Sequence, residues 1–372
     1  MSERPRTVLQ VLPALVAGGV ERGTLEIAEA LVGAGWRALV ASAGGPLVGP
    51  LERLGARHLA LPLGRKSPLG IWRNAAALAR LVRAEGVDIL HARSRAPAWA
   101  ALLAARRGGA HLVTTYHGTY NEGWPGKRLY NSVMARGERV IAISGFIAEH
   151  VRARHGTDPA RLRVIPRGVD ERRFDPAAVP AARVSALRAA WDVPEGRPMV
   201  MLPGRLTRWK GQTVLLDAMA RLPGDAVALL VGEGGLRREL EARVAGLGLA
   251  ERARLCGHAE DMPAALLLAD VVVHASTDPE AFGRTVIEAQ AMARPVIASD
   301  LGAPRETVEE GVTGWRVPPG DPAALAGAIA RALALPPAER AAMGERARTA
   351  VRARYTTRAM QEATLAVYRE LP

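Results

Sequence analysis

Short apolar runs rich in Val, Ile and Leu alternate along the chain with longer segments rich in Ala, Leu and Arg that have a helical period. This alternation is typical of parallel sheets covered by helices. In the first half the expected strands are 7–12, 37–42, 58–63, 87–92, 111–116, 139–144 and 161–166. In the second half they are 198–204, 226–232, 253–257, 270–276 and 294–300. The pattern predicts an α/β protein.

Helices are expected between most of these strands. Residues 19–35 carry their apolar side chains largely on one side, and Gly33 and Gly35 end the segment. Similar helices are expected at 211–222 and 236–248. The pattern therefore predicts that crossover helices connect the successive parallel strands of each sheet.

Near the middle of the chain the strand and helix periodicity is lost, and Pro and charged residues form clusters. We expect a first domain at 1–170, a linker at 171–196 and a second domain at 197–355. The last helix, about 356–372, is expected to pack back onto the first domain. Tandem parallel-sheet domains tend to bind a ligand where the carboxyl ends of their sheets face each other, so residues that follow strands become candidates for the site.

Composition excludes several classes of protein. With 372 residues and 49% hydrophobic content the chain can form large cores, and no stretch reaches the roughly 20 apolar residues of a spanning helix. The apolar start of the chain resembles a signal peptide, but Gln10 and Pro13 interrupt it, so we interpret it as a strand and a loop. The lone Cys256 excludes an intramolecular disulfide framework and a multi-cysteine zinc site, and a cytoplasmic setting is expected.

The net charge of +13 indicates an anionic partner. Residues 1–170 hold 24 basic and 12 acidic side chains, so 24 − 12 gives +12 and the first half carries nearly all the excess. Nucleic acid, anionic lipid headgroups and a phosphorylated substrate all fit this asymmetry. Only three of the fifty cations are lysines, so a basic surface that merely reflects an Arg-rich composition is the alternative.

Three strand ends in the first domain carry candidate residues. Gly18 and Gly19 lie between the first strand and the first helix, where backbone amides can approach a phosphate; a plain tight turn is the alternative. His117 follows the fifth strand and is expected to project toward a substrate hydroxyl rather than into a core; a purely structural histidine is the alternative. His91, with Arg93 and Arg95 behind it, either meets an anionic acceptor or caps the sheet edge.

Two cations follow the first strand of the second domain. Arg205 and Lys210 are five residues apart and precede a helix that begins near Gly211, so they form a pocket for a diphosphate and can stabilise charge on a leaving group. Solvated surface cations are the alternative. The chain has no P-loop and no Asp-x-Asp pair, so we expect protein cations to act without Mg²⁺.

Two acids lie eight positions apart, with Glu280 in a loop and Glu288 on the following helix. A carboxylate accepts two hydroxyl hydrogen bonds, as from a ribose diol, and the amides of residues 282–285 open the helix beside the phosphates. The alternative is a loop acid and a helix-surface acid, both solvated.

Six motifs in register resemble glycosyltransferase family 4 of the GT-B fold: "AGGVE", "TTYHG", "VIPRGVDERRF", "GRLTRWKG", "VGEGGLRREL" and "EAFGRTVIE". The resemblance covers nearly the whole chain. It implies two Rossmann-like domains facing across a cleft. It also implies a retaining, metal-independent transferase that needs no cofactor and takes a sugar from a UDP- or GDP-sugar donor.

The resemblance also implies roles for single residues. Arg205 and Lys210 hold the diphosphate, Glu280 binds donor-sugar hydroxyls, His117 lines the donor-sugar site and Glu288 binds the ribose. The nucleotide-binding residues that it implies are Gly18, Gly19, Gly204, Glu233, Phe282, Gly283, Arg284, Thr285 and Glu288.

A narrower resemblance links "HARSRAPAWA" and "TTYHGTYN" to bacterial transferases that extend lipopolysaccharide cores or related surface glycans. It implies a glycan or glycolipid acceptor. We therefore expect peripheral contact with the inner face of an anionic membrane, through the arginines Arg93, Arg95, Arg106, Arg107 and Arg128.

Two other functions stay open. A sugar-nucleotide epimerase or a phosphorylase can share the fold. A basic nucleic-acid-binding protein is the non-enzyme alternative, but aromatic residues are only 4% of the chain and no stacking stripe is present, so no nucleic-acid partner is expected.

Overall fold

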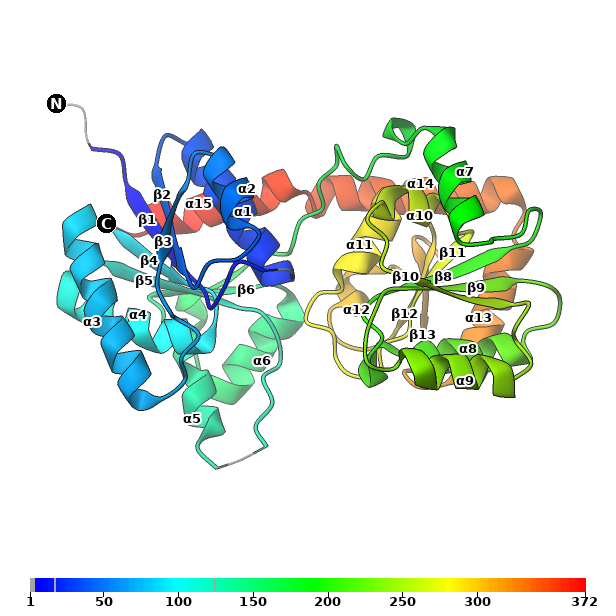
Figure 1. Cartoon of the computed structure of the whole chain (residues 1–372), viewed down its shortest axis with the longest axis horizontal. Coiled ribbons are helices and arrows are strands. Elements are labelled where there is room, and N and C mark those ends of the chain that lie inside the picture. Colours follow the sequence, from blue (N-terminus) through cyan, green and yellow to red (C-terminus); the bar gives the residue numbers. More distant parts are fainter. Residues whose placement is uncertain (1–3, 17, 124) are drawn as a thin grey trace. The chain divides into compact units, whose positions relative to one another are not determined.

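The computed structural model describes residues 4–16, 18–123 and 125–372, and the chain divides into two compact units (Figure 1). Unit 1 comprises the chain up to Arg167 together with Arg358–Pro372, and unit 2 comprises Gly168–Thr357. Each unit is built on one parallel sheet, so the predicted α/β class is confirmed. Among the described residues, no helix is long and apolar enough to cross a bilayer.

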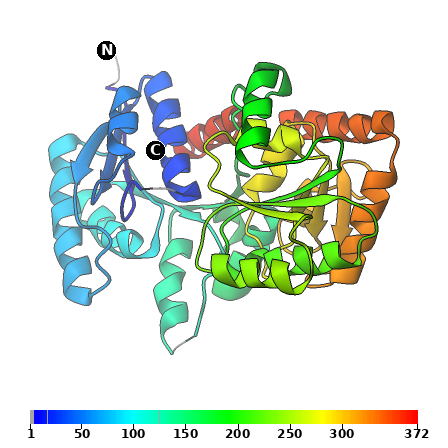
Figure 2. The ribbon, with the colours of Figure 1, turned by 45° about the vertical axis from the view of Figure 1, so that its right-hand side comes forward.

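Unit 1 contains a seven-stranded sheet in the order β3-β2-β1-β4-β5-β6-β7. Its strands are β1 Thr7–Val11, β2 Arg37–Ser42, β3 Arg57–Ala60, β4 Ile89–Ala92, β5 His111–Tyr116, β6 Arg139–Ala142 and β7 Leu162–Val164. Its helices are α1 Gly19–Gly33, α2 Val48–Arg53, α3 Pro68–Glu85, α4 Arg95–Gly108, α5 Lys127–Asn131, α6 Gly145–His155 and α15 Thr357–Arg369, with 3₁₀ turns η1 Ser132–Ala135 and η2 Pro159–Arg161. Helix α3 packs against α4 and lies at the outer edge of this unit (Figures 1 and 2).

Unit 2 contains a six-stranded sheet in the order β10-β9-β8-β11-β12-β13. Its strands are β8 Met199–Pro203, β9 Val227–Val231, β10 Ala253–Gly257, β11 Val271–His274, β12 Val296–Ser299 and β13 Gly314–Val317. Its helices are α7 Ala181–Ala190, α8 Gln212–Arg221, α9 Arg237–Gly246, α10 Met262–Leu268, α11 Arg284–Ala291, α12 Pro304–Thr307, α13 Pro322–Ala334 and α14 Pro337–Arg354, with 3₁₀ turns η3 Pro176–Ala178 and η4 Arg208–Lys210.

The observed elements differ from the expected ones at three places. β3 ends at Ala60, before Pro62, which has no N–H to donate to a sheet. β13 was not expected, because its four residues include a glycine and an arginine and only one β-branched residue. Residues 171–196, expected as a linker, belong to unit 2 and include α7, which packs against α10.

Both sheets share one topology with a reversal of strand order. Without β7, the order in unit 1 is 3-2-1-4-5-6, and the order in unit 2 is the same when its strands are counted from β8. The direction of winding reverses between β1 and β4, and again between β8 and β11, which pair directly. In sheets of this kind ligands bind beside the carboxyl ends of those two strands. The topology therefore makes the loops after β1, β4, β8 and β11 the candidate ligand-binding segments.

The last helix, α15, completes the core of unit 1. Met360, Leu365, Val367 and Tyr368 pack with side chains from α1 and the sheet. Tyr368 is fully buried, and its hydroxyl lies 2.6 Å from Nδ1 of the buried His91. A chain segment remote in sequence is thus part of the hydrophobic core of this unit.

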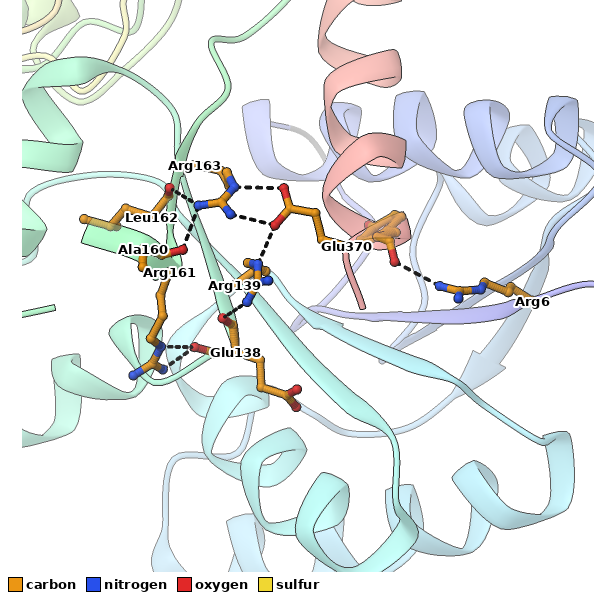
Figure 3. Close-up of polar contacts among 10 residues, drawn as sticks. Arg6, Glu138, Arg139, Ala160, Arg161, Leu162, Arg163 and Glu370 are labelled. Carbon is orange, nitrogen blue, oxygen red and sulfur yellow. Dashed lines mark hydrogen bonds and ion pairs between the residues drawn. The ribbon is translucent and has the colours of Figure 1, made fainter. Parts of the chain in front are cut away.

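Glu370, beyond the end of α15, is held by two arginines of the sheet (Figure 3). Arg139 on β6 donates from Nε at 2.5 Å, and Arg163 on β7 donates from Nε and Nη2 at 2.8 and 2.7 Å. Arg6 donates to the carbonyl oxygens of Tyr368 and Leu371. The hydrogen bond from Arg163, reinforced by that from Arg139, lowers the pKa of Glu370 from 4.5 to about 2.

We predict that Glu370→Gln destabilises unit 1 by about 1 kcal/mol at pH 7, since each partly exposed ion pair contributes about 0.2–1 kcal/mol. Because the folded-state pKa is below 4.5, this contribution is complete above pH 4.5 and is lost as pH falls toward 2. Urea unfolding of both proteins at pH 7 and pH 3 measures it. Glu362→Gln is the control, because Glu362 lies on α15 and, among the residues that the structure describes, pairs only with Arg358 one turn away. An equal effect of the two substitutions would contradict this assignment.

Candidate functional site

The loop after β8 contains the first pair of predicted residues. Arg205 is exposed, and within the described chain its guanidinium has no hydrogen bond or ion pair. Lys210 ends the turn η4, and its ammonium lies 4.3 Å from the centre of the Trp209 ring. The side chain of Lys210 passes over Gly204, where a Cβ would lie 3.6 Å from Lys210 Cδ. Lys210 is thus packed in place, whereas Arg205 is open to solvent.

Gly211 allows this loop to pack against the end of β11. Its φ is +74°, and an added Cβ would overlap the carbonyl oxygen of Ala275. The amide of Thr277 also donates to the carbonyl of Trp209 at 2.9 Å. Since glycine alone fits both the dihedral and the close approach, the sequence Trp-Lys-Gly is required for Lys210 to stand beside the β11 loop.

Glu280 and Lys210 form an ion pair, although they are 70 positions apart in the sequence. Their side chains are only 12% and 15% exposed. Ser276 donates to Glu280 Oε1 at 3.1 Å, and Nε2 of His274 lies 3.3 Å from the same oxygen. Burial alone would raise the pKa of Glu280, but His274 and Lys210 together lower it to about 2. The carboxylate is therefore ionised at neutral pH, and acts as an acceptor rather than as an acid.

The helix α11 begins directly after this loop. Gly283 caps it with φ +80°, and Arg284 and Thr285 form its first turn. The ring of Phe282 is buried against Tyr355, so only the backbone of Phe282 is available to a ligand. Arg284 donates to the carbonyl of Gly168 at 3.3 Å. Glu288 lies on the same helix and is half-buried.

The loop after β9 packs against the loop after β8. The amide of Gly204 donates to the carbonyl of Val231 at 2.8 Å, and a Cβ on Gly232 would overlap the carbonyl oxygen of Gly204. Glu233 is exposed and forms an ion pair with Arg237 at 3.2 Å. Glu233 therefore lies at the predicted strand end but is not in contact with the Lys210–Glu280 pair through any hydrogen bond in the described chain.

In unit 1 the glycine turn lies at the amino end of α1. Gly18 has φ +149° and caps the helix, and a Cβ there would lie 2.6 Å from Oε2 of Glu21. Gly19 is the first helical residue. This turn follows β1, one of the two strands at which the order of the sheet reverses.

His117 follows β5, and its Nδ1 lies 2.6 Å from Nη2 of Arg167. Burial, followed by the charges of Arg167 and Arg93, lowers the pKa of His117 well below its ordinary value. The ring is therefore neutral at physiological pH. His117 was a predicted site residue, whereas Arg167, 50 positions further on in the motif "VIPRGVD", was not.

The interpretation of His91 and Arg93 as acceptor-binding residues is corrected. His91 is within β4, 1% exposed, and its ring nitrogens contact Tyr368 and Thr115 at 2.6 and 2.7 Å. Arg93 is 2% exposed and donates to Gln10 at 2.9 Å. His91 lies in an apolar strand and Arg93 directly follows it, and the sequence alone does not show that α1 and α15 cover them. Neither side chain can reach a membrane surface.

The other predicted arginines differ in their exposure. Arg95 begins α4 and donates to Asn131 at 2.8 Å. Its guanidinium carbon lies 4.5 Å from the centre of the Tyr120 ring. Arg106, Arg107 and Arg128 are exposed, and Arg128 donates to the carbonyl of Arg154. Of these four arginines, Arg95 and Arg128 thus have side chains that are already engaged in hydrogen bonds.

Two family models match the chain in succession. The model described as "Glycosyltransferase Family 4" matches residues 17–173, and that described as "Glycosyl transferases group 1" matches residues 184–350. Together they cover both units. The fold and these matches define a glycosyltransferase of the GT-B fold.

Two curated relatives are similar to this chain. A D-inositol 3-phosphate glycosyltransferase of Geodermatophilus obscurus is 36% identical over 216 residues, which are 54% of this chain and 47% of the relative. The GDP-mannose-dependent α-(1-6)-phosphatidylinositol monomannoside mannosyltransferase of Mycolicibacterium smegmatis is 31% identical, with 73% of each chain covered. The chain thus spans about half the length of the first relative and nearly three quarters of the second.

Two solved structures are similar over nearly the whole chain. The crystal structure of a glycosyltransferase from Rickettsia africae is 36% identical and covers 99% of both chains with a TM-score of 0.91. Anabaena HepE in complex with UDP-glucose is 26% identical, with 98% of this chain and all of that chain covered and a TM-score of 0.84. This chain belongs to glycosyltransferase family 4, as its motifs indicated.

We predict that Gly211→Ala displaces Lys210 and weakens the site. Alanine at φ +74° costs about 1–2 kcal/mol, and overlap with Ala275 adds about 1–3 kcal/mol. Thermal unfolding and calorimetric titration with UDP-glucose and GDP-mannose measure the two effects. Gly248→Ala is the matched control, because Gly248 has φ +67° but no atom within 4 Å of an added Cβ. Equal stability loss in both variants would show that the close approach to Ala275 contributes nothing.

Proposed function

We propose that this protein is a retaining, metal-independent hexosyltransferase that moves a sugar from a nucleotide diphosphate sugar to a glycan or glycolipid acceptor. The observation that carries the proposal is the Lys210–Glu280 pair, enclosed at the point of unit 2 where strand order reverses. Lys210 supplies a cation that can bind a diphosphate, and Glu280 supplies an ionised carboxylate that can bind sugar hydroxyls. The two side chains are in direct contact.

The cations of this site act on the leaving group. An ammonium has three donors, and Glu280 takes one of those on Lys210, so the others are available to phosphate oxygens. Arg205 is exposed and free to add a bidentate contact. In this proposal the two cations stabilise the charge that develops on the nucleoside diphosphate, and no metal ion is needed.

Glu280 orients the sugar. With a pKa of about 2 it stays ionised and accepts hydrogen bonds from donor-sugar hydroxyls beside the anomeric carbon. Glu288 binds the ribose hydroxyls. The amides of Phe282, Gly283, Arg284 and Thr285 face the phosphates, and Gly204 and Glu233 flank the nucleotide.

In this proposal unit 1 also has residues that bind a nucleotide sugar. Gly18 and Gly19 let backbone amides approach the phosphates at the amino end of α1. His117, neutral and half-buried, donates to the donor sugar. The acceptor binds to unit 1, whose basic excess suits a phosphorylated glycan or lipid.

The acceptor class rests on two kinds of likeness. The motif similarity to lipopolysaccharide-core transferases supports a bacterial surface glycan, and the names of the two relatives refer to an inositol phosphate and a phosphatidylinositol mannoside. Both names refer to a phosphorylated inositol. An epimerase or phosphorylase remains the alternative, and it would convert a nucleotide sugar without such an acceptor or release sugar phosphate.

The test is transfer from UDP- and GDP-sugars to a phosphorylated glycolipid acceptor, with the anomeric configuration of the product determined by NMR. We predict retention, and activity that survives EDTA. Lys210→Met should lower kcat about 10² to 10³-fold with little change in donor affinity, because its contact strengthens as the diphosphate leaves. Glu288→Ala should instead raise the donor Kd.

Three outcomes would overturn the proposal. An inverted product would exclude the retaining mechanism, and conversion of the nucleotide sugar without acceptor would favour an epimerase. A wild-type rate in Lys210→Met would remove the role of the cation. Val164→Met, at an exposed position of β7, is a control for nonspecific effects of a surface substitution.

We also propose peripheral contact with an anionic membrane on the cytoplasmic side, through the outer face of α3. Leu69 and Trp72 are each 55% exposed on this helix. Five exposed cations accompany them, and within the described chain none forms an ion pair or side-chain hydrogen bond: Arg65, Lys66, Arg73, Arg80 and Arg83. No acid occurs between Arg57 and Ala84.

A bilayer fits this face better than nucleic acid does. Trp and Leu side chains insert at the boundary between headgroups and acyl chains, while Lys and Arg contact anionic lipids for about 1 kcal/mol each. The opposite face of α3 is buried, and the helix lies at the outer edge of unit 1 (Figures 1 and 2). We therefore propose this face of α3 as the membrane contact in place of the arginines that were predicted from the sequence, among which Arg93 is buried.

We predict that the protein sediments with vesicles containing phosphatidylglycerol at low salt and is released by high salt. Trp72→Ala and the pair Arg73→Glu with Arg80→Glu should each weaken sedimentation several-fold. The pair Arg106→Glu with Arg107→Glu is the matched control, since it changes the same charge on α4. Equal binding to neutral vesicles, or a loss only in the α4 control, would contradict the assignment to α3.

A further inference from the structure

The contact between Arg167 and His117 determines which nitrogen of the histidine carries its proton. Nη2 of Arg167 lies 2.6 Å from Nδ1 of His117. A guanidinium can only donate, so Nδ1 must be the acceptor and has no proton. A neutral imidazole then carries its single proton on Nε2.

The second ring nitrogen of His117, Nε2, is available to donate a hydrogen bond to a ligand. Nε2 of His117 is buried, and no atom of the described residues accepts a hydrogen bond from it. A buried N–H without an acceptor is unfavourable, and such groups in folded proteins call for an explanation. An acceptor oxygen on a bound molecule would satisfy it.

Arg167 is held in place by its surroundings rather than by local sequence. Arg167 is 5% exposed, and a Cβ on Gly23 of α1 would overlap its Nη1 and lie 2.8 Å from Nη2 of Arg93. Arg93 is anchored to Gln10 at 2.9 Å, and Gln10 donates to the carbonyl of Thr24 at 3.0 Å. The glycine leaves room for two guanidinium groups side by side.

These neighbours also keep the histidine neutral. The groups that lower its pKa are, after burial itself, Arg167, Arg93 and His91, all of them in unit 1. His91 is buried and its own pKa is lowered well below the ordinary value. No carboxylate is among the causes acting on His117, so no neighbour favours the doubly protonated ring.

We infer that Arg167 is a positioning residue that holds His117 in the Nε2–H tautomer, so that His117 donates one hydrogen bond to an oxygen of the bound donor. The ligand atom it fits is a hydroxyl or phosphate oxygen rather than an N–H group. This inference rests on the proposed function for the identity of the ligand, whereas the tautomer follows from unit 1 alone.

Long-range ¹H–¹⁵N NMR of the histidine side chains in the full chain tests the tautomer without substrate, with His117 assigned from His117→Gln. In the wild type we expect a bare Nδ1 and a protonated Nε2 at pH 7. Arg167→Met removes both donor and charge, so it should give a mixture of tautomers and a higher pKa for His117. Arg167→Gln retains an N–H donor and should restore the Nε2–H tautomer.

Arg152→Met on the surface of α6 is the matched control and should change neither property. A wild-type ring protonated on Nδ1, or an unchanged tautomer and pKa in Arg167→Met, would overturn the inference. If Arg167→Met is poorly folded, the wild-type spectrum and Arg167→Gln decide the matter.

The ligand is tested separately. UDP-glucose or GDP-mannose should shift the Nε2 resonances of wild-type His117, and Arg167→Met should lower kcat/KM about tenfold, as for one lost hydrogen bond, with recovery in Arg167→Gln. If neither nucleotide sugar shifts the resonances, the ligand assignment is wrong even where the tautomer is right. If transfer is absent but the shift occurs, the proposed reaction fails and the donor contact stands.

Discussion

The parallel arrangement of every strand is the constraint on which the rest of this molecule depends. Parallel neighbours must be joined by crossovers, so all carboxyl ends of a sheet gather on one edge. Where the strand order reverses, two adjacent loops diverge and leave room between them. In unit 2 these are the loops that carry Lys210 and Glu280. In unit 1 they are the loop that ends at the glycine turn and the loop that begins with Arg93.

Charge is handled differently in the two units. In unit 2 a carboxylate enclosed with an ammonium stays ionised, since the partner charges outweigh the cost of burial. In unit 1 two buried guanidinium groups lie beside two histidines, and both rings are held neutral. One unit thus presents a pre-formed ion pair with spare donors, and the other presents an uncharged donor with a defined tautomer. Both arrangements suit a ligand that is rich in oxygen atoms.

The arginine excess of the first half has three structural outcomes. Arg139 and Arg163 attach the end of the C-terminal helix to the sheet through Glu370. Arg93 and Arg167 are buried beside α1. The cations of α3 are exposed without acidic partners. Net charge alone does not separate these outcomes, because it counts a buried guanidinium and a solvated one equally.

The sequence by itself determined the α/β class, twelve of the thirteen strands and the family, because alternation of apolar runs and strand-end motifs are local properties. It also named Lys210, Glu280 and His117. Only the tertiary structure decided that Lys210 and Glu280 pair across 70 positions, that Arg167 reaches His117 across 50, and that His91 and Arg93 are covered by other elements. These contacts depend on which helix packs over which strand end, and a periodicity of two or 3.6 residues carries no information about that.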